Sequence, residues 1–281
     1  MPVAASGDLI TRARDARRGI AAFNIVTLEQ AEAVATAAEG AGLPVILQIS
    51  QNAVRFHHDR PAGLVAAATA VAEAAAVPVA LHLDHVESTG LLRSAAGTAV
   101  SSVMFDASRL PYRENVRETA RAAEWAHAHG LWLEAELGEI GGKDGAHAPG
   151  ARTDPAEAAR FVGGTGVDAL AVAVGSSHAM TERTARLDHR LIGALRRALP
   201  VPLVLHGSSG VPDGELRAAV EAGMVKVNIG TALGIAFTGA VRDRLAADPA
   251  VVDPRRYLAE ARAAVARTAE HLLRVVAGAA G

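Results

Sequence analysis

The chain has 281 residues, a formal net charge of −2 and no cysteine, and 50% of its residues are hydrophobic. This length suits one large domain with a sizeable core, the near-neutral charge argues against nucleic-acid binding, and the lack of cysteine excludes disulfides and thiolate metal sites. No apolar run is long enough to span a bilayer or to form a signal-peptide core, so we expect a cytoplasmic protein with no membrane partner.

Apolar, β-branched segments alternate with alanine-rich segments of helical periodicity. The eight predicted strands are Ile20–Asn24, Val45–Ser50, Val79–His85, Val100–Asp106, Leu131–Leu137, Ala169–Val174, Leu203–His206 and Met224–Asn228. The helical segments between them include Leu28–Ala41, Glu114–His129 and Arg186–Leu199. Eight strand–helix repeats predict an α/β fold, a (β/α)8 TIM barrel in a single domain of residues 1–281. The alternative is an open doubly wound sheet, although no G-x-G-x-x-G follows the first strand, which weakens a dinucleotide-binding interpretation.

Two segments lie outside this repeat. Gly138–Asp154, after the fifth strand, is the longest glycine-rich loop, and we expect either a mobile active-site flap or a solvated surface loop. A C-terminal helical extension covers about residues 254–281, with helical periodicity over Arg255–Val276. We expect it to pack over the barrel or against a partner subunit.

Side chains alternate between the two faces of each predicted strand. In Leu131–Leu137 every second residue is apolar, while Glu134 and Glu136 share the opposite face; Lys226 and Asn228 share one face of the last strand. We expect these polar faces to line the barrel interior. The polar residues at the strand ends are Asn24, Ser50, Asp84, Asp106, Glu136, Ser176, His206 and Asn228. Barrel active sites lie at this face, so these residues are candidate site residues.

Three short motifs each begin where a strand gives way to a loop: Leu81–His85, Gly175–His178 and Leu205–Gly210. Together they supply three imidazoles from distant parts of the chain. Three neutral imidazoles and an open position are typical of a catalytic zinc site. Asp84 lies beside one of them and is interpreted either as a proton-transfer group or as an acceptor that orients an imidazole. His82 also points inward and is interpreted as a hydrogen-bonded core residue or a site residue.

Four further features leave alternatives open. Asp106 and Glu136 are interpreted as metal ligands, bases or buried acceptors. Gly207–Gly210 and Asn228–Thr231 follow the seventh and eighth strands, where backbone amides of barrel loops often bind phosphate. Either loop could also be an ordinary turn.

The ordered set of motifs resembles the class II, metal-dependent ketose-bisphosphate aldolases, which include fructose- and tagatose-bisphosphate aldolases. The matching motifs are His82–His85, Glu134–Gly138, Gly175–His178, Leu205–Gly210 and Val227–Thr231, within a similarity that runs from Phe23 to Arg255. The resemblance implies that His85, His178 and His206 hold Zn²⁺ and that Asp84 is the acid/base at the substrate C4 hydroxyl. Asp106 and Glu136 match acidic positions that serve a displaced metal or a second cation, divalent or monovalent.

The resemblance also implies the substrate contacts. The residues expected to bind substrate or phosphate are Asn24, Ser50, Ala179, Gly207, Ser209, Asn228, Gly230, Thr231 and Arg255. Arg255 matches an arginine that reaches the distal phosphate in a neighbouring subunit, so a homodimer or homotetramer is expected. Asp144 is the expected donor of the proton at carbon, with Glu139 as the alternative. Relatives usually carry Asp at Gly230 and Gly at Ala179, and these departures bear on the aldehyde half of the substrate.

The resemblance therefore predicts a zinc-dependent, reversible aldol cleavage of a ketose (bis)phosphate, with fructose 1,6-bisphosphate as the first candidate. The products would be dihydroxyacetone phosphate and an aldehyde such as glyceraldehyde 3-phosphate. A tagatose-bisphosphate or other ketose-phosphate aldolase is the alternative. Three further alternatives are a Schiff-base aldolase that uses Lys226, a metal-dependent amidohydrolase, and a non-catalytic ligand-binding barrel. The amidohydrolase would usually need His-x-His on the first strand, where Ala22-Phe23-Asn24 stands.

Overall fold

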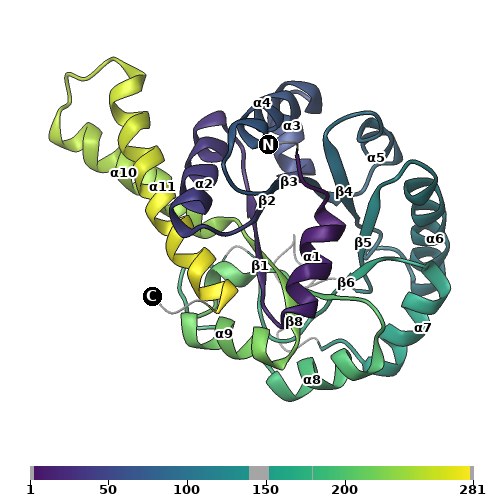
Figure 1. The fold of residues 1–281 in the computed structure, drawn as a ribbon. Helices are drawn as coiled ribbons and strands as arrows, with labels where there is room; N and C mark the ends of the chain where they lie inside the picture. The colour runs from purple at the N-terminus through teal and green to yellow at the C-terminus, as the bar shows by residue number, and fades with distance from the viewer. Residues whose placement is uncertain (1–2, 139–151, 179, 279–281) are drawn as a thin grey trace.

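The computed structural model describes residues 3–138, 152–178 and 180–278. Within them, eight parallel strands pair in chain order, and the last strand pairs with the first to close a barrel (Figure 1). This confirms the predicted TIM barrel and excludes the open sheet. The strands are β1 Ile20–Asn24, β2 Val45–Ser50, β3 Val79–Val86, β4 Val100–Phe105, β5 Trp132–Glu136, β6 Ala169–Ala171, β7 Leu203–Leu205 and β8 Met224–Ile229.

Helices surround the barrel. They are α1 Ser6–Asp15, α2 Leu28–Ala41, α3 Gln51–Phe56, α4 Pro61–Ala74, α5 Thr89–Ser94, α6 Tyr112–Ala128, α7 Pro155–Thr165, α8 His189–Ala198, α9 Asp213–Ala222, α10 Thr231–Ala247 and α11 Pro254–Ala277. The helix α2 has the predicted bounds because Thr27 and Gln30 form a capping box at its start and Gly42, at φ 64°, ends it. None of the described helices is long and apolar enough to cross a membrane.

The predicted strand ends differ from the observed ends by up to three residues. The largest difference is in β6, which ends at Ala171 although the buried apolar run continues to Val174. The apolar composition of this run made it resemble a strand, whereas the chain leaves the strand ladder before Gly175, where φ is 121°. The strand β3, in contrast, continues one residue beyond the predicted end, to Val86.

The barrel interior changes character along its axis. At the amino ends of the strands, Leu9 and Ile10 of α1 pack against Ile20, Ile46 and Ala80, and α1 lies across the barrel in Figure 1. This helix was not among the predicted elements. In the middle of the barrel the side chains are polar and almost fully buried. They are Gln48, His82, Ser102, Glu134 and Lys226, none more than 1% exposed. The predicted inward direction of the polar strand residues is thus confirmed for Glu134 and Lys226.

The last two helices form a hairpin that projects from the barrel (Figure 1). The carboxyl half of α11 is buried through residues such as Leu272 and Val276 and contacts α2, α9 and β1. The helix α10 packs against α11 and buries only Leu233 fully among its described residues. The carboxyl half of the last helix therefore packs over the barrel, which was one of the two expectations. The tip of the hairpin extends beyond the barrel.

The close approach of α11 to the barrel generates a prediction. The Gly19 N–H donates to the Val276 carbonyl at 3.2 Å, and a Cβ at Gly19 would lie 2.6 Å from that oxygen and 2.9 Å from Val220 Cγ2. Gly19→Ala should lower the free energy of unfolding by about 1–3 kcal/mol, because the backbone cannot move away without strain. Urea denaturation measures the loss.

The matched control is Gly63→Ala in α4, where no atom lies within 4 Å of the new methyl group. This change should leave the free energy of unfolding unchanged or raise it by up to about 1 kcal/mol. Equal stability of the two variants would contradict the packing argument.

Candidate functional site

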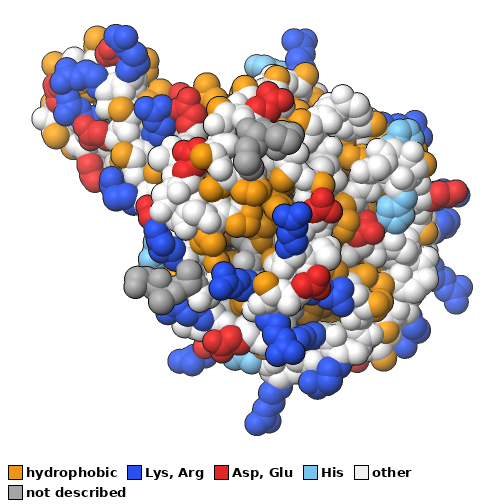
Figure 2. Space-filling view, viewed as in Figure 1, with side chains coloured by type: hydrophobic (Ala, Val, Ile, Leu, Met, Phe, Trp, Pro, Cys, Tyr) orange, Lys and Arg blue, Asp and Glu red, His pale blue; other side chains and the backbone are white. Residues whose placement is uncertain are grey.

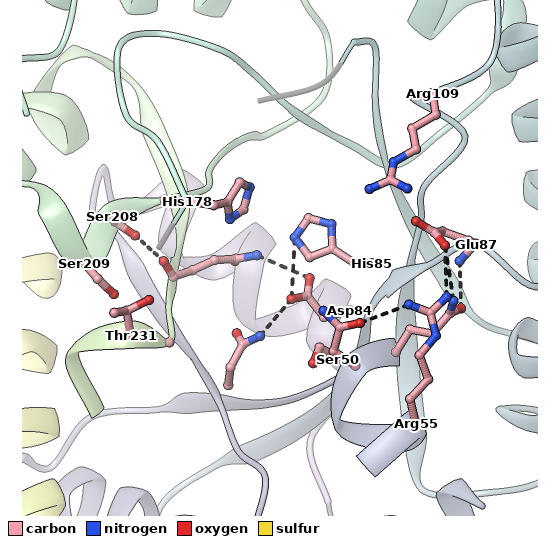
Figure 3. Close-up of a pocket in the computed structure, with 16 residues that line it drawn as sticks. Ser50, Arg55, Asp84, His85, Glu87, Arg109, His178, Ser208, Ser209 and Thr231 are labelled. Atoms are coloured by element: carbon pink, nitrogen blue, oxygen red, sulfur yellow. Dashed lines mark hydrogen bonds and ion pairs between the residues drawn. The ribbon is translucent and has the colours of Figure 1, made fainter. Parts of the chain in front are cut away.

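A pocket of about 400 Å³ opens at the carboxyl ends of the strands (Figure 3). Ten of the predicted site residues line it: Asn24, Ser50, Asp84, His85, His178, Gly207, Ser209, Asn228, Gly230 and Thr231. Six further residues line it as well: Gln51, Asn52, Arg55, Glu87, Arg109 and Ser208. Its position and size are those of a small-molecule site in a (β/α)8 barrel.

The three predicted metal ligands come together. One potential ligand atom from each of His85, His178 and His206 lies within 4.8 Å of the others. The ring centroid of His85 lies 5.2 Å from that of His178 and 4.8 Å from that of His206. Among the described residues, this is the group of His, Asp and Glu side chains whose spacing fits a metal ion. The residues come from β3, from the loop after β6 and from the end of β7.

Asp84 and His85 are adjacent in sequence, yet both side chains line the pocket. Strict alternation would send them to opposite faces of β3. The structure resolves this through an irregular pairing with β4 between Leu83 and Val86, and His85 adopts a left-handed conformation with φ 50°. This bulge turns two successive side chains to the same side. A left-handed histidine is uncommon and strained, which is typical of functional sites.

Carboxylates hold two of the three imidazoles. Asp106 Oδ2 lies 3.0 Å from His85 Nδ1, and Glu134 Oε1 lies 3.0 Å from His206 Nε2. In each ring the other nitrogen is the one left to act as a ligand, Nε2 in His85 and Nδ1 in His206. Such carboxylate contacts fix the tautomer and orientation of metal-binding histidines. Asp106 is thus placed to orient a ligand, and Glu136 Oε2 lies 3.4 Å from His206 Nδ1, on the ligand side of that ring.

The charges around the cluster favour a cation. Burial alone would lower the pKa of His206, but hydrogen bonds and attraction from Glu134 and Glu136 raise it to about 9. The buried carboxylates therefore stabilise positive charge at this position, which a divalent ion would supply in place of a proton. Three imidazoles, two orienting carboxylates and a nearby third carboxylate fit a zinc-type site.

A network of amides fixes the Asp84 carboxylate. Asn24 Nδ2 donates to Asp84 Oδ2 at 3.0 Å, Gln48 Nε2 donates to Asn24 Oδ1 at 2.7 Å, and Asn228 Nδ2 lies 3.5 Å from Asp84 Oδ1. Burial would raise the pKa of Asp84, but electrostatic attraction to His85, His206 and Lys226 holds it below its usual value. The carboxylate is therefore ionised. Asn24 and Asn228, expected as substrate contacts, are also the partners of this carboxylate.

Lys226 and His82 belong to the barrel interior rather than to the pocket wall. Lys226 Nζ lies 2.7 Å from Glu134 Oε2, and both side chains are fully buried. An ion-paired ammonium is not a nucleophile, so this contact argues against a Schiff-base lysine. His82 Nδ1 lies 2.7 Å from Ser102 Oγ, and burial together with Lys226 lowers the pKa of His82 to about 3. His82 is therefore a neutral core histidine.

The loops after β7 and β8 are tied together at the predicted phosphate site. Gly207 has φ 66°, and a Cβ there would lie 2.5 Å from the backbone of Ser177 in the loop after β6, so the close approach of the β6 and β7 loops requires glycine. Ser208 Oγ donates to the Asn228 carbonyl, and the Ala232 N–H donates to Ser209 Oγ at 3.1 Å. The amino end of α10, a helix of 17 residues, faces the same wall of the pocket.

Some predicted site residues lie elsewhere. Arg255, at the start of α11, does not line the pocket; its side chain is 89% exposed and pairs with Asp253 at 2.6 Å. Asp144, Glu139 and Ala179 lie outside the described residues. Sequence reasoning missed three charged residues of the pocket wall, Arg55, Glu87 and Arg109. The available signal was their position, a few residues beyond a polar strand end.

The buried ion pair generates a prediction. Lys226→Met should lower the free energy of unfolding by about 3–5 kcal/mol, because it leaves Glu134 buried without its cation. It should also weaken metal binding, since Glu134 holds the His206 ring. Denaturation of the metal-free protein and a competitive chelator titration measure the two effects. The double variant Lys226→Met/Glu134→Gln should recover most of the stability; no recovery would show that the cost does not arise from the unpaired carboxylate.

Comparisons with known proteins agree with this geometry. The family model described as fructose-bisphosphate aldolase class II matches residues 4–281. The chain is 38% identical to a fructose-bisphosphate aldolase of Geobacillus stearothermophilus over 276 residues, covering 95% of this chain and 94% of the relative. It is also 38% identical, over 272 residues and 95% of each chain, to a protein of Bacillus subtilis (strain 168) named a probable fructose-bisphosphate aldolase. The crystal structure of the YdjI aldolase from Escherichia coli K12 superimposes with a TM-score of 0.84 at 32% identity, covering 98% of this chain and 97% of that one. The chain therefore belongs to the class II fructose-bisphosphate aldolase family.

Proposed function

We propose that the protein catalyses the reversible, zinc-dependent aldol cleavage of a ketose (bis)phosphate, with fructose 1,6-bisphosphate as the first substrate to test. The observation that carries the proposal is the convergence of three imidazoles and the Asp84 carboxylate at one pocket in a chain of this family. Two relatives at 38% identity bear the name fructose-bisphosphate aldolase. The products would be dihydroxyacetone phosphate and an aldehyde such as glyceraldehyde 3-phosphate.

His85, His178 and His206 would hold the metal. When bound there, Zn²⁺ supplies Lewis-acid stabilisation of the negative charge that develops as the carbon–carbon bond breaks. Asp106 and Glu134 orient two of the ligands through their 3.0 Å contacts. We propose that Glu136, whose Oε2 lies 3.4 Å from His206 Nδ1, can contact a displaced metal or a second divalent or monovalent cation.

Asp84 is the proposed acid/base. In cleavage, its carboxylate takes the proton of the C4 hydroxyl, the C4–O bond becomes the aldehyde carbonyl, and the electron pair of the C3–C4 bond passes to the ketone fragment. A proton delivered to C3 then completes dihydroxyacetone phosphate. The amides of Asn24 and Asn228 hold the carboxylate in place, so it needs no reorientation during the reaction. We propose that Asp144, or alternatively Glu139, donates the proton at C3.

The phosphate of the ketone half would bind at the joined loops of β7 and β8. Gly207, Ser209, Gly230 and Thr231 line that side of the pocket, where backbone amides and the start of α10 favour an anion. Ser50, at the end of β2, and Ala179 remain proposed substrate contacts. Binding at these points would position C3 and C4 relative to Asp84.

The exposed position of Arg255 favours a shared site. Arg255 lies at the start of α11, in the hairpin that projects from the barrel in Figure 1, and Figure 2 shows both basic and acidic side chains on this projection. Its guanidinium is 89% exposed and does not reach the pocket of its own chain. We propose that in a homodimer or homotetramer it binds the distal phosphate of the substrate held by a neighbouring copy.

The first test is cleavage of fructose 1,6-bisphosphate by purified protein before EDTA treatment, after it, and after addition of Zn²⁺. Activity should disappear with EDTA and return with zinc. Asp84→Ala should retain zinc but lose turnover by about 10²–10⁴-fold, because the ligands remain and the proton acceptor is gone. Metal analysis and initial rates measure both.

The same experiment separates the alternatives. Activity indifferent to EDTA, with borohydride trapping of substrate, would instead assign the reaction to Lys226. A near-normal rate in Asp84→Ala would remove Asp84 from the mechanism. Bound zinc without cleavage of this sugar would direct the search to tagatose 1,6-bisphosphate and other ketose phosphates.

The shared site can be tested by complementation. Arg255→Ala should raise KM for a bisphosphate substrate by about tenfold or more, because a charge-assisted contact is lost. Co-expressed Arg255→Ala and Asp84→Ala chains should regain activity, because mixed oligomers place an intact Asp84 beside an intact Arg255. Arg256→Ala, at the neighbouring exposed position, is the control and should have little effect. No gain in the mixed oligomers would contradict the sharing of Arg255.

A further inference from the structure

A second pocket, of about 410 Å³, lies at the opposite end of the barrel from the proposed active site. It forms where the carboxyl ends of α1, α8 and α9 meet the amino ends of β7 and β8. Figure 2 shows basic side chains gathered in this region, at the end of α1 that lies toward α8 and α9 in Figure 1. We call it the arginine pocket, because its lining includes Arg14, Arg17, Arg18 and Arg196. Its size is that of a small-molecule site.

The positive charge of the arginine pocket is not cancelled by the chain. Among the described residues, no carboxylate forms an ion pair with any of the four arginines. Two carboxylates, those of Asp15 and Glu221, also line the pocket. Four positive and two negative charges give the lining a formal charge of +2, in a chain whose net charge is −2. The pocket therefore attracts anions although the molecule as a whole does not.

The backbone at Arg17 shows that helix termination alone does not explain this cluster. Arg14 and Arg196 lie in the last turns of their helices, where positive charge is favourable in itself. Arg17 lies beyond α1 at φ 53°. The Arg17 N–H donates to the Arg14 carbonyl at 3.0 Å and the Arg18 N–H to the Ala13 carbonyl at 2.9 Å, which is a Schellman motif. Glycine is the usual residue at this left-handed position, so an arginine there has a conformational cost.

Arg196 crosses the end of α9 to reach the same pocket. A Cβ at Gly223, the C-cap of α9, would lie 2.5 Å from Arg196 Cδ and 3.0 Å from its Cβ, so the stem of this arginine packs on the glycine backbone. Apolar residues also contribute to the lining, among them Leu199, Val201 and Val220. The arginine pocket thus combines guanidinium groups with an apolar surface.

We propose that the arginine pocket binds an organic polyphosphate, a small molecule that joins a phosphate chain to a ring with apolar faces, such as a nucleoside triphosphate. Guanidinium groups present paired donors and a permanent positive charge to phosphate oxygens. The apolar lining accommodates the ring, whose burial is favourable. The proposed aldol cleavage uses the other end of the barrel, so binding here does not depend on that reaction. The inference gives the amino face of this barrel a role beyond stability.

The test is isothermal titration calorimetry of the full chain with ATP, tripolyphosphate and adenosine. ATP should bind with a Kd below about 1 mM, tripolyphosphate should bind more weakly, and adenosine should not bind in this range. Added NaCl should raise the Kd for ATP, because salt screens exposed charges. Tripolyphosphate binding as tight as that of ATP would overturn the role of the ring, and adenosine binding as tight as that of ATP would overturn the role of the charge.

Variants at the ends of α8 and α9 locate the binding. Arg196→Gln should raise the Kd for ATP by about fivefold or more, because a charge-assisted contact is lost. Arg197→Gln is the matched control, since it removes a charge from the next exposed position of α8, outside the pocket. It should change the Kd by less than about twofold. Glu221→Gln should lower the Kd, because it removes a negative charge from the lining.

Arg17→Gly separates ligand binding from fold stability. It should raise the Kd for ATP about as much as Arg196→Gln does, whereas the Tm without ligand should not fall, because glycine fits the left-handed backbone at φ 53°. Thermal unfolding measures the Tm. No ATP binding by the wild type up to about 1 mM, or equal Kd values for the wild type, Arg196→Gln and Arg17→Gly, would overturn the proposal. Equal losses in Arg196→Gln and Arg197→Gln would do so as well.

Discussion

The buried contact between Lys226 and Glu134 is the interaction on which the site depends. Both side chains are inaccessible to solvent, and the Nζ–Oε2 distance is 2.7 Å. A lone carboxylate at this depth would be protonated or would destabilise the fold, because desolvation of an unpaired charge is costly. With Lys226 on one oxygen, Glu134 remains ionised and uses the other to hold His206. One ion pair thus links the barrel interior to the orientation of His206, a proposed metal ligand.

The barrel interior supports this arrangement in layers. The helix α1 and its apolar neighbours close the amino end, so the polar middle layer is isolated from solvent on that side. From that middle layer Gln48 donates a hydrogen bond to Asn24, whose amide in turn donates to Asp84, and Ser102 contacts His82 Nδ1. The Asp84 carboxylate is therefore held by Asn24, whose own position is fixed by its hydrogen bond to Gln48. Rigid support of this kind keeps reacting groups in place and reduces reorganisation during catalysis.

The sequence predicted much of the fold because alternation of strands and helices is a local pattern repeated eight times. It also indicated the three histidines and Asp84, because polar residues at strand ends converge in a closed parallel barrel. It did not predict the bulge at His85, since period-two alternation carries no signal for an extra residue. The partner of Lys226 was equally hidden, because Glu134 lies 92 residues away and pairs across the barrel. The pocket residues Arg55, Glu87 and Arg109 lie in a helix and in loops without a periodic pattern.

The bulge in β3 has an evolutionary consequence. Since it brings Asp84 and His85 to the same side, the proposed proton acceptor and one proposed metal ligand are encoded by two consecutive codons in one strand–helix unit. Exchange of that unit between related barrels would transfer both functions together, whereas Arg55 and Arg109, which line the same pocket, belong to the preceding and following units. Recombination could therefore diversify the substrates of such a barrel while its bond-breaking chemistry is inherited intact.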